Sequence, residues 1–383
     1  MSSGLRIGLV CPYSFDTPGG VQNHVVGLAR HLRDAGHQPY VLAPGELGRA
    51  ATALDVSHFT TAGSAIPVRY NGSVARVNFG PLSAARVRRW LRSQPFDLLH
   101  IHEPITPSIA ILALWAAETP VVATFHTATP RSRSMQLAGG AMRASIEKID
   151  AGIAVSESAR NVVIQHLGRD SVVIPNGFDF ADFAFPLPTV GRWRGGAGPR
   201  LVFLGRVDEP RKGFEVLLAA GPLIRERHPD LEVVVAGQGS RMLPSWCRSV
   251  GEISDAEKVA LLASADVFVA PHLERESFGI VLLEAMASGA TVVASDLAPF
   301  LDLLGPAPGT DGVALGELFT RGDSAALAAA VNRVLDRRDD DRARRAQQSA
   351  KRYDWSLVGP AITTVYEAAL AVAGPDHARE EVS

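Results

Sequence analysis

Short apolar runs alternate with amphipathic segments through the first half of the chain. The runs suit buried strands and lie at 5–10, 39–42, 98–101, 121–125, 152–155 and 172–174. After the first run, the apolar residues within 25–32 recur at helical spacing, and Gly36 is placed to end that helix. Helical patterns separate several of the other strands. This alternation predicts a doubly wound parallel sheet.

The same alternation starts again near residue 200. Further strands are expected at 201–204, 231–236, 267–271 and 291–295. The stretch 183–200 is rich in Pro, Gly and Arg and has no clear period, so we interpret it as an interdomain linker. The sequence therefore predicts an α/β protein with two Rossmann-like domains, at 1–186 and 199–355, that face each other across a cleft. Ligands of such sheets bind beyond the carboxyl ends of the strands.

Composition narrows the class of protein. The chain has 383 residues, which fits two domains, and its net charge of −2 gives no basic field that would favour nucleic acid. Two cysteines, Cys11 and Cys247, exclude a disulfide framework and suit a reducing cytoplasm. No signal peptide is recognisable, and the apolar run 109–117 is too short to cross a bilayer. Any membrane contact is therefore expected to be peripheral.

Two carboxylates, Glu276 and Glu284, flank a glycine and an apolar run. The run 280–287 predicts a buried helix that Gly289 ends. Glu276 would lie just before the helix N-terminus, where backbone N–H groups and the helix dipole favour an anion such as a diphosphate. Glu284 would lie about two turns further on, within reach of another part of the same ligand. The pattern indicates an enzyme that binds a sugar nucleotide.

Two loops after predicted strands could approach such a ligand. Arg206 and Lys212 follow the strand 201–204 and could neutralise a diphosphate leaving group; the alternative is a solvated basic loop. The paired glycines at 19–20 follow the first strand and allow close approach of a backbone; the alternative is an ordinary turn. The first strand is not followed by the glycine fingerprint of dinucleotide-binding proteins.

Three histidines and one helix start have both structural and functional interpretations. His126 follows the strand 121–125 and could bind a sugar hydroxyl, although a lone histidine is more often structural. His100 and His102 alternate on one strand face, but no further ligand follows at metal-site spacing, so we expect no metal there. Ser254 begins a capping motif. The functional alternative is that Asp255 and Lys258 contact a nucleobase.

A basic segment in the first half of the chain could contact a membrane. Arg86, Arg88, Arg89 and Arg92 surround Trp90 on a predicted helix. Basic residues beside a tryptophan suit an anionic lipid surface. The alternative is a solvated helix face.

Taken together, these residues resemble the retaining GT-B glycosyltransferases of family four, most closely the actinobacterial phosphatidylinositol mannosyltransferases that add the first mannose. The resemblance runs from Arg6 to about Tyr366. It rests on the glutamate pair and on the stretches CPYSFD (11–16), PGGVQ (18–22), YNGSVAR (70–76), HIHEP (100–104), EPRKG (209–213) and APH (270–272). It implies transfer of mannose from GDP-mannose to the inositol ring of phosphatidylinositol, the first step of phosphatidylinositol mannoside biosynthesis, with retention of configuration. It also implies a helix at about 356–375 that crosses back to the first domain.

The resemblance also implies roles for individual residues. Donor binding falls to Gly20, Arg206 and Lys212 at the diphosphate, Glu284 at the ribose, Ile253, Asp255 and Lys258 at the guanine, and His126 and Glu276 at the mannose. Of these, His126, Arg206, Lys212 and Glu276 are the expected catalytic residues. The acceptor pocket would be lined by Tyr13, Gln22, Tyr70, Asn71, Arg76, Thr127 and Arg131. The basic docking helix would present Arg86, Arg88, Arg89 and Trp90.

The chain departs from the family pattern at a few positions. Ala85 stands where the family's basic cluster begins, Arg131 replaces a lysine, and the stretch 239–250 is shorter than its counterpart. None of these changes touches the glutamate pair. The sequence shows no obvious nucleophile near His126, so the expected mechanism is front-face attack assisted by the leaving diphosphate. Arg206 and Lys212 would supply positive charge, so no obligatory cofactor and no fixed metal site is expected.

The expected location is the cytoplasm, with peripheral binding to the anionic inner face of the plasma membrane. Three other classes remain as alternatives. A family-four transferase could use a soluble acceptor such as an inositol phosphate. A non-catalytic sugar-nucleotide sensor is disfavoured by the complete set of site residues. A nicotinamide dehydrogenase is disfavoured by the missing glycine fingerprint.

Overall fold

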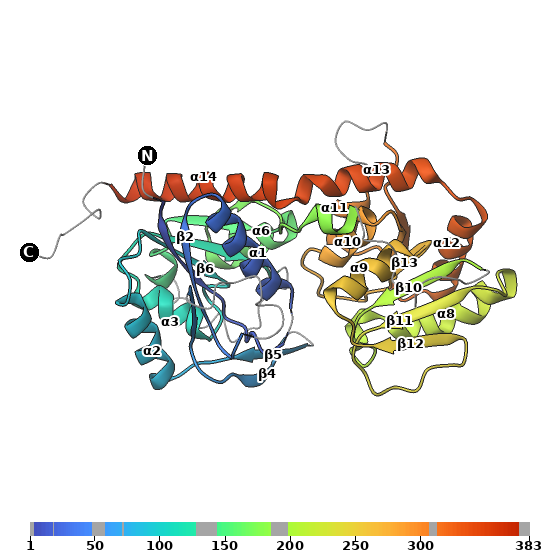
Figure 1. The fold of residues 1–383 in the computed structure, drawn as a ribbon, viewed down its shortest axis with the longest axis horizontal. Helices are drawn as coiled ribbons and strands as arrows, with labels where there is room; N and C mark the ends of the chain where they lie inside the picture. The colour runs from blue at the N-terminus through green and yellow to red at the C-terminus, as the bar shows by residue number, and fades with distance from the viewer. Residues whose placement is uncertain are drawn as a thin grey trace, which may run out of the picture. The chain divides into compact units, whose positions relative to one another are not determined.

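The computed structural model describes residues 4–17, 19–47, 58–70, 73–127, 144–184, 198–305 and 312–374. The chain forms two compact units (Figure 1). The first contains Met1–Phe178 and Trp355–Ser383, and the second contains Asp179–Asp354. The chain therefore passes between the units twice. Residues 179–184, expected in the first domain, are grouped with the second.

The first unit is built on a seven-stranded parallel sheet with the order β3-β2-β1-β6-β7-β8-β9. Its strands are β1 (Arg6–Val10), β2 (Gln38–Ala43), β3 (Phe59–Thr61), β6 (Leu98–His102), β7 (Val121–Phe125), β8 (Ala151–Ala154) and β9 (Val172–Val173). Six of the seven were predicted; β3, which is short and largely exposed, was not. The strand order reverses between β1 and β6, so the loops after these two strands lie at a topological switch point.

Helices cover both faces of this sheet (Figure 1). They are α1 (Gly20–Asp34), α2 (Pro81–Leu91), α3 (Ile109–Ala116), α6 (Glu157–Leu167) and α14 (Trp355–Ala373). The buried residues of α1 and α14 share one core with Ile7 and Leu9, whereas α2 and α3 share another with Val10 and Leu99. This division follows from the alternation of side chains along β1. An antiparallel hairpin that we did not predict, β4 (Ile66–Tyr70) and β5 (Ser73–Val77), lies outside the main sheet.

The last helix of the described chain, α14, belongs to the first unit. It packs against α1, β7 and β8. Trp355 at its start lies against two glycines: a Cβ atom on Gly27 or Gly177 would lie 2.5 or 2.6 Å from its indole ring. The helix is long and apolar enough to span a bilayer, but Ile362, Tyr366 and other residues on one side of it are buried in the core of this unit.

The second unit is built on a six-stranded parallel sheet with the order β12-β11-β10-β13-β14-β15. Its strands are β10 (Arg200–Leu204), β11 (Glu232–Ala236), β12 (Cys247–Gly251), β13 (Val267–Ala270), β14 (Thr291–Ser295) and β15 (Glu317–Phe319). The edge strands β12 and β15 were not predicted, since neither is an apolar run. The order reverses between β10 and β13, so the loops that carry Lys212 and Glu276 follow the two strands at the switch point.

Helices also surround the second sheet. They are α7 (Phe180–Ala184), α8 (Phe214–Arg227), α9 (Asp255–Ala263), α10 (Ile280–Ala287), α11 (Ala298–Leu304), α12 (Ser324–Asp336) and α13 (Asp340–Ala350), with single 3-10 turns at Pro210–Lys212 and Lys351–Tyr353. The prediction of a linker at 183–200 was wrong at both ends. Phe183 is buried in α7 and Arg200 is the first residue of β10, where it pairs with Glu232.

Candidate active site

A basic loop of the second unit is docked onto the segment after β13. Gly213 has a φ of 67°, in the left-handed region that favours glycine. A Cβ atom at this position would lie only 1.7 Å from the carbonyl oxygen of Pro271. The backbone N–H of Leu273 donates to the carbonyl oxygen of Arg211 over 2.8 Å. This close approach places the loop that carries Lys212 beside the segment that carries Glu276.

Glu276 is held by two basic groups. Its Oε2 lies 2.9 Å from His272 Nδ1 and 3.4 Å from Lys212 Nζ. Burial alone would raise the pKa of Glu276, but the charge of Lys212 and then the hydrogen bond to His272 bring it well below its usual value. Burial and the nearby Lys212 charge lower the pKa of His272. Glu276 is therefore a carboxylate that accepts hydrogen bonds.

Glu284 is the centre of a second charged group. It is buried in α10, and its Oε1 accepts a hydrogen bond from Lys258 Nζ over 2.8 Å. Lys258 also lies 3.6 Å from Asp255 Oδ1. Burial would lower the pKa of Lys258, but the charge of Glu284 raises it above its usual value. The structure thus brings together three residues that were predicted to bind the nucleoside.

The start of α9 shows that the capping interpretation of Ser254 was correct. Ser254 accepts from the backbone N–H of Glu257, and the Glu257 carboxylate accepts from the backbone N–H of Ser254. Asp255 is exposed and the neighbouring Ile253 is half-buried. The cap fixes the first turn of the helix, and Lys258 lies one turn further on, where it reaches Glu284.

The second unit also has a cationic side chain and backbone N–H groups that could bind an anion. Among the described residues, the side chain of Arg206 makes no hydrogen bond or ion pair, and it is exposed. Gly279, with a φ of 98°, precedes α10 and has no side chain with which to cap it. The first N–H groups of α10 therefore lack the usual capping acceptor, which is the arrangement that favours an anionic ligand.

In the first unit, Gly20 begins α1 and is exposed. A Cβ atom there would meet no described residue within 4 Å, so the backbone can approach a ligand closely. Gln22, in the first turn of the same helix, is buried, and its Nε2 donates to the carbonyl oxygens of Ser14 and Thr17 over 3.0 and 3.3 Å. Gln22 was predicted to bind the acceptor, and in the structure its amide nitrogen holds the loop before α1.

His126 and Thr127 leave the end of β7 and are held by Glu103. The backbone N–H of His126 and the hydroxyl of Thr127 both donate to Glu103 Oε1, over 2.6 and 2.9 Å. Glu103 is buried and has a φ of 51°, in the left-handed region. The imidazole of His126 also contacts His102: its Nε2 lies 3.0 Å from His102 Nδ1.

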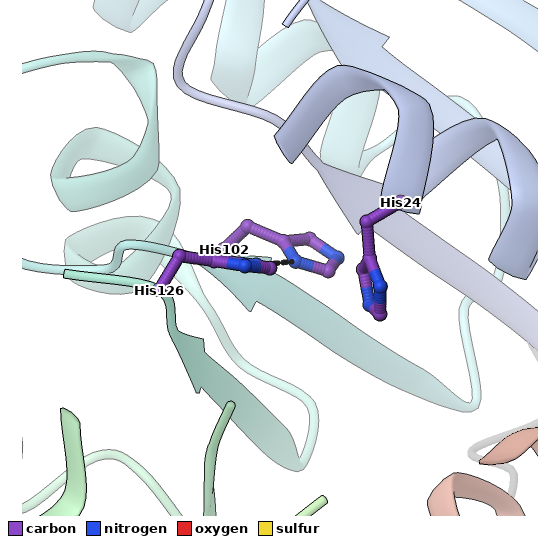
Figure 2. Close-up of side chains that lie close together, drawn as sticks. All are labelled: His24, His102 and His126. Atoms are coloured by element: carbon purple, nitrogen blue, oxygen red, sulfur yellow. Dashed lines mark hydrogen bonds between the residues drawn. The ribbon is translucent and has the colours of Figure 1, made fainter. Parts of the chain in front are cut away.

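His24, His102 and His126 form a buried histidine cluster (Figure 2). One ring nitrogen of each lies within 4.8 Å of the others, so the cluster has the residue types of a metal site. Two of these nitrogens already face each other in the bond between His102 and His126, as Figure 2 shows. In this bond one ring donates and the other accepts, so neither of the two nitrogens has a lone pair free for a metal ion. The arrangement fits a pair of neutral imidazoles better than a set of metal ligands.

Burial keeps these rings uncharged. It lowers the pKa of His24 to about 3 and the pKa of His102 and His126 well below the ordinary value of 6.5. Among the described residues, neither ring nitrogen of His24 has a hydrogen-bond partner, and the ring lies 5.1 Å from that of Trp355. His100 has a structural role, as its Nδ1 and Nε2 lie 2.7 Å from Tyr366 and Thr124 hydroxyl oxygens.

The predicted acceptor residues are only partly described. Tyr13 forms a β-bridge with Val77, and the backbone N–H of Ser14 donates to the carbonyl oxygen of Arg76, so the β4–β5 hairpin lies beside the loop after β1. The Arg76 side chain is exposed. Asn71, Arg131 and the side chain of Tyr70 lie outside the described residues.

The predicted membrane helix, α2, presents arginines but not its tryptophan. Arg86, Arg88 and Arg89 are exposed, and Arg86 also donates to the carbonyl oxygen of Ala62 over 3.0 Å. The prediction that Trp90 contacts lipid was wrong. Trp90 is buried, with its ring 4.7 Å from that of Phe96, because its position in the helix faces the sheet.

Exposed apolar residues lie at the other end of α2 from Trp90. Leu82 and Phe79, at and just before the start of α2, are 75% and 51% exposed. Ile66 on β4 is 64% exposed and pairs with Val77, two residues before Phe79. The sequence interpretation missed them because it followed the charged residues.

Comparison with known proteins decides the family. The family model described as Glycosyltransferase Family 4 matches residues 18–182, and the one described as Glycosyl transferases group 1 matches 198–337. A phosphatidyl-myo-inositol mannosyltransferase from Propionibacterium freudenreichii subsp. shermanii is 48% identical over 378 residues, which cover 98% of this chain and 97% of the relative. The chain belongs to the phosphatidyl-myo-inositol mannosyltransferase family.

A second member of the phosphatidyl-myo-inositol mannosyltransferase family, from Mycolicibacterium smegmatis, is 47% identical over 377 residues, 95% of this chain and 94% of the relative. Among solved structures, Anabaena HepE in complex with UDP and glucose matches with a TM-score of 0.71 at 21% identity, over 95% of this chain and 100% of HepE. The protein is therefore a glycosyltransferase with the GT-B fold, as the sequence predicted.

Three residues of this mannosyltransferase-family site were not assigned a role from the sequence. His272 bonds Glu276, Glu103 bonds the His126 segment, and His24 completes the histidine cluster. His272 and Glu103 each follow a strand, a position that could have drawn attention to them. His24 lies within an amphipathic helix, and nothing in its spacing links it to His102.

Replacing His24 with leucine should make the first unit less sensitive to acid. Between the folded pKa of about 3 and the ordinary value of 6.5, the unfolded chain binds more protons, so stability is lost as pH falls through this range. The His24→Leu variant should lose less, by about 1.4 kcal/mol for each pH unit in that window. Urea unfolding followed at about pH 6 and about pH 5 measures the difference. An acid slope equal to that of the wild type would contradict a neutral, buried His24.

Proposed function

We propose that this protein transfers mannose from GDP-mannose to the inositol ring of phosphatidyl-myo-inositol, with retention of configuration, as the first step of phosphatidylinositol mannoside biosynthesis. The observation that carries the proposal is the 48% identity over nearly the whole chain to a phosphatidyl-myo-inositol mannosyltransferase. Residues expected to bind the donor also meet in the second unit, where Lys212 contacts Glu276 and Lys258 contacts Glu284.

The donor would lie along the carboxyl ends of β10 and β13. Arg206 and the open N-terminus of α10 offer positive charge and N–H donors to the diphosphate, and Gly20 of the first unit would contribute its backbone. Glu284 would accept hydrogen bonds from the ribose hydroxyls. Lys258 holds Glu284 in place, and with Asp255 and Ile253 it would contact the guanine.

Two residues would hold the mannose during transfer. Glu276 is a carboxylate fixed by His272 and Lys212, so it would accept hydrogen bonds from sugar hydroxyls. His126 would meet the sugar from the first unit. Glu103 is a carboxylate next to His126, but its Oε1 already accepts two hydrogen bonds. This engagement suits a structural acceptor and supports a mechanism without an enzyme nucleophile.

Transfer would therefore proceed by attack on the face from which the diphosphate leaves. The diphosphate oxygen would accept the proton of the inositol hydroxyl as the new bond forms. Arg206 and Lys212 would stabilise the charge that develops on the leaving group. Because these cations supply the charge, we expect no divalent metal to be required at a fixed site.

The acceptor is a lipid, so the enzyme would bind the anionic inner face of the plasma membrane peripherally. Arg88 and Arg89 would contact anionic headgroups, and Leu82 and Phe79 would enter the interface. Tyr13, Tyr70, Asn71, Arg76, Thr127 and Arg131 would surround the inositol headgroup.

Incubation with phosphatidylinositol vesicles and GDP-mannose should add one hexose to the lipid. The lipid fraction is examined by mass spectrometry, with UDP-glucose in a parallel reaction as the matched donor control. An α-linked product by NMR is expected from retention, and a β-linked product would refute it. Hexose on lipid from UDP-glucose would overturn the assignment of the donor. GDP release only with a soluble inositol phosphate would overturn the lipid acceptor.

Replacing Arg206 with alanine should reduce kcat by about 100-fold or more, because one donor to the developing negative charge is lost. The fold should be unaffected, since Arg206 is exposed and makes no ion pair among the described residues. Arg337→Ala, another exposed arginine of the second unit, is the matched control and should keep wild-type turnover. Near-normal turnover of Arg206→Ala would contradict a role at the diphosphate.

Vesicle binding should depend on both the charged and the apolar residues of α2. Arg88/Arg89→Ser should weaken co-sedimentation with vesicles that contain anionic lipid by about 30-fold, at about 1 kcal/mol for each charge. Leu82→Ser should weaken it further. Arg337/Arg338→Ser removes two exposed charges from the second unit and serves as the control. Equal binding by the two double variants would contradict docking through α2.

A further inference from the structure

The segment His126–Thr127 is held by two consecutive residues of the chain. His102 bonds the ring of His126 through Nδ1, and Glu103 accepts from the main chain of His126 and from the hydroxyl of Thr127. Consecutive residues of a strand normally point to opposite faces. Here both side chains reach the same segment, because β6 ends at His102 and Glu103 has a φ of 51°.

The backbone conformation of Glu103 is unfavourable for a residue with a side chain. Glu103 and Arg275 are the two residues other than glycine that have a positive φ in the described part of the chain. Such strain persists only where surrounding contacts impose it, and it concentrates at functional sites. The contacts are present: the N–H of Glu103 donates to the carbonyl oxygen of Thr124, and its carbonyl oxygen accepts from Thr106.

The ring of His102 is itself fixed. It stacks on His100 with ring centroids 4.4 Å apart, and His100 is bonded to Tyr366 and Thr124. His24 closes the other side, with its ring 5.5 Å from that of His102 and 5.2 Å from that of His126 (Figure 2). With both rings neutral, the bond between His102 and His126 couples their tautomers: both rings carry the proton on Nδ1, or both carry it on Nε2. His102 Nε2 has no hydrogen-bond partner among the described residues, and a buried N–H without a partner is rarer than a buried acceptor without one. The pair in which His102 Nδ1 donates to His126 Nε2 is therefore favoured.

We infer that His102 and Glu103 are positioning residues for mannosyl transfer: Glu103 fixes the main chain of His126–Thr127, and His102 fixes the orientation and tautomer of the His126 ring. The inference rests on the proposed role of His126 and Thr127 in substrate binding. Neither positioning residue needs to touch a substrate. Their effect is to keep the groups of this segment at one place while the sugar–phosphate bond breaks.

Substitutions at Glu103 separate positioning from simple structural support. Glu103→Gln keeps an oxygen that can accept from both donors, so kcat should stay within about threefold of the wild type. Glu103→Leu removes the acceptor, and kcat should fall by about 30-fold or more while KM for GDP-mannose changes little. Glu103→Gly relieves the left-handed strain, so kcat should fall even if the melting temperature holds or rises.

Asp150→Leu is the matched control. It removes a carboxylate that accepts from the backbone N–H of Val121 over 2.7 Å, at the opposite end of β7 from His126. It should lower the melting temperature and leave kcat unchanged. If Glu103→Leu and Glu103→Gly likewise keep their kcat, whatever their melting temperatures, positioning is overturned and the role of Glu103 is structural.

NMR of protein with ¹⁵N-labelled histidine reports the tautomer of the His126 ring without relying on activity. His126 should show one protonated and one unprotonated nitrogen in the wild type. His102→Leu should average its tautomers, and His102→Asn, which can still bond Nε2, should partly restore the single tautomer and kcat. Unchanged His126 shifts in His102→Leu would overturn the inference. One equivalent of Zn²⁺ bound by the wild type and lost in His24→Leu would overturn it too.

The two hypotheses fail in different ways. If the wild type adds no hexose to phosphatidylinositol, the proposed function fails, and the NMR comparison still decides whether His102 orients His126. If the wild type is active and Glu103→Leu keeps its kcat, the proposed function stands and positioning by Glu103 is overturned.

Discussion

The second unit depends on keeping the carboxylate of Glu276 charged where little water reaches it. A carboxylate that is buried without a partner becomes neutral, and a neutral acid cannot accept a full set of hydrogen bonds from a sugar. Lys212 and His272 prevent this at Glu276, and Lys258 lies against Glu284. The sheet order makes both contacts possible, because it puts the loops after β10 and β13 side by side.

In the first unit, burial keeps histidine rings uncharged, whereas in the second unit neighbouring basic groups keep Glu276 charged. Desolvation is the largest influence on His24, His100, His102 and His126, and it lowers the pKa of each ring, so the rings stay neutral. Neutral rings can both donate and accept, whereas imidazolium rings would repel one another. The two units thus differ in their buried polar groups: the second holds fixed charges, and the first holds neutral, oriented hydrogen-bonding groups.

The sequence was sufficient for the fold and for local arrangements, and less so for contacts between distant segments. Apolar runs located the inner strands, and the helix Ile280–Ala287 was predicted with its observed bounds. Edge strands such as β12 were missed because exposed strands lack an apolar run. Trp90 was misassigned because a count of charges does not show which helix face meets the sheet. The pairing of Glu276 with His272 and the approach of His24 to His102 depend on tertiary geometry.

The return of α14 to the first unit has a consequence for how the protein is made. Trp355 packs against Gly27 and Gly177, so one core joins residues from both ends of the chain. During synthesis the first unit cannot complete this core until the ribosome has translated the second unit and released residues beyond 355. The second unit, which is continuous in sequence, can fold earlier. The first unit, though made first, is therefore the last to close, and until then its apolar surface beside α1 needs protection from aggregation.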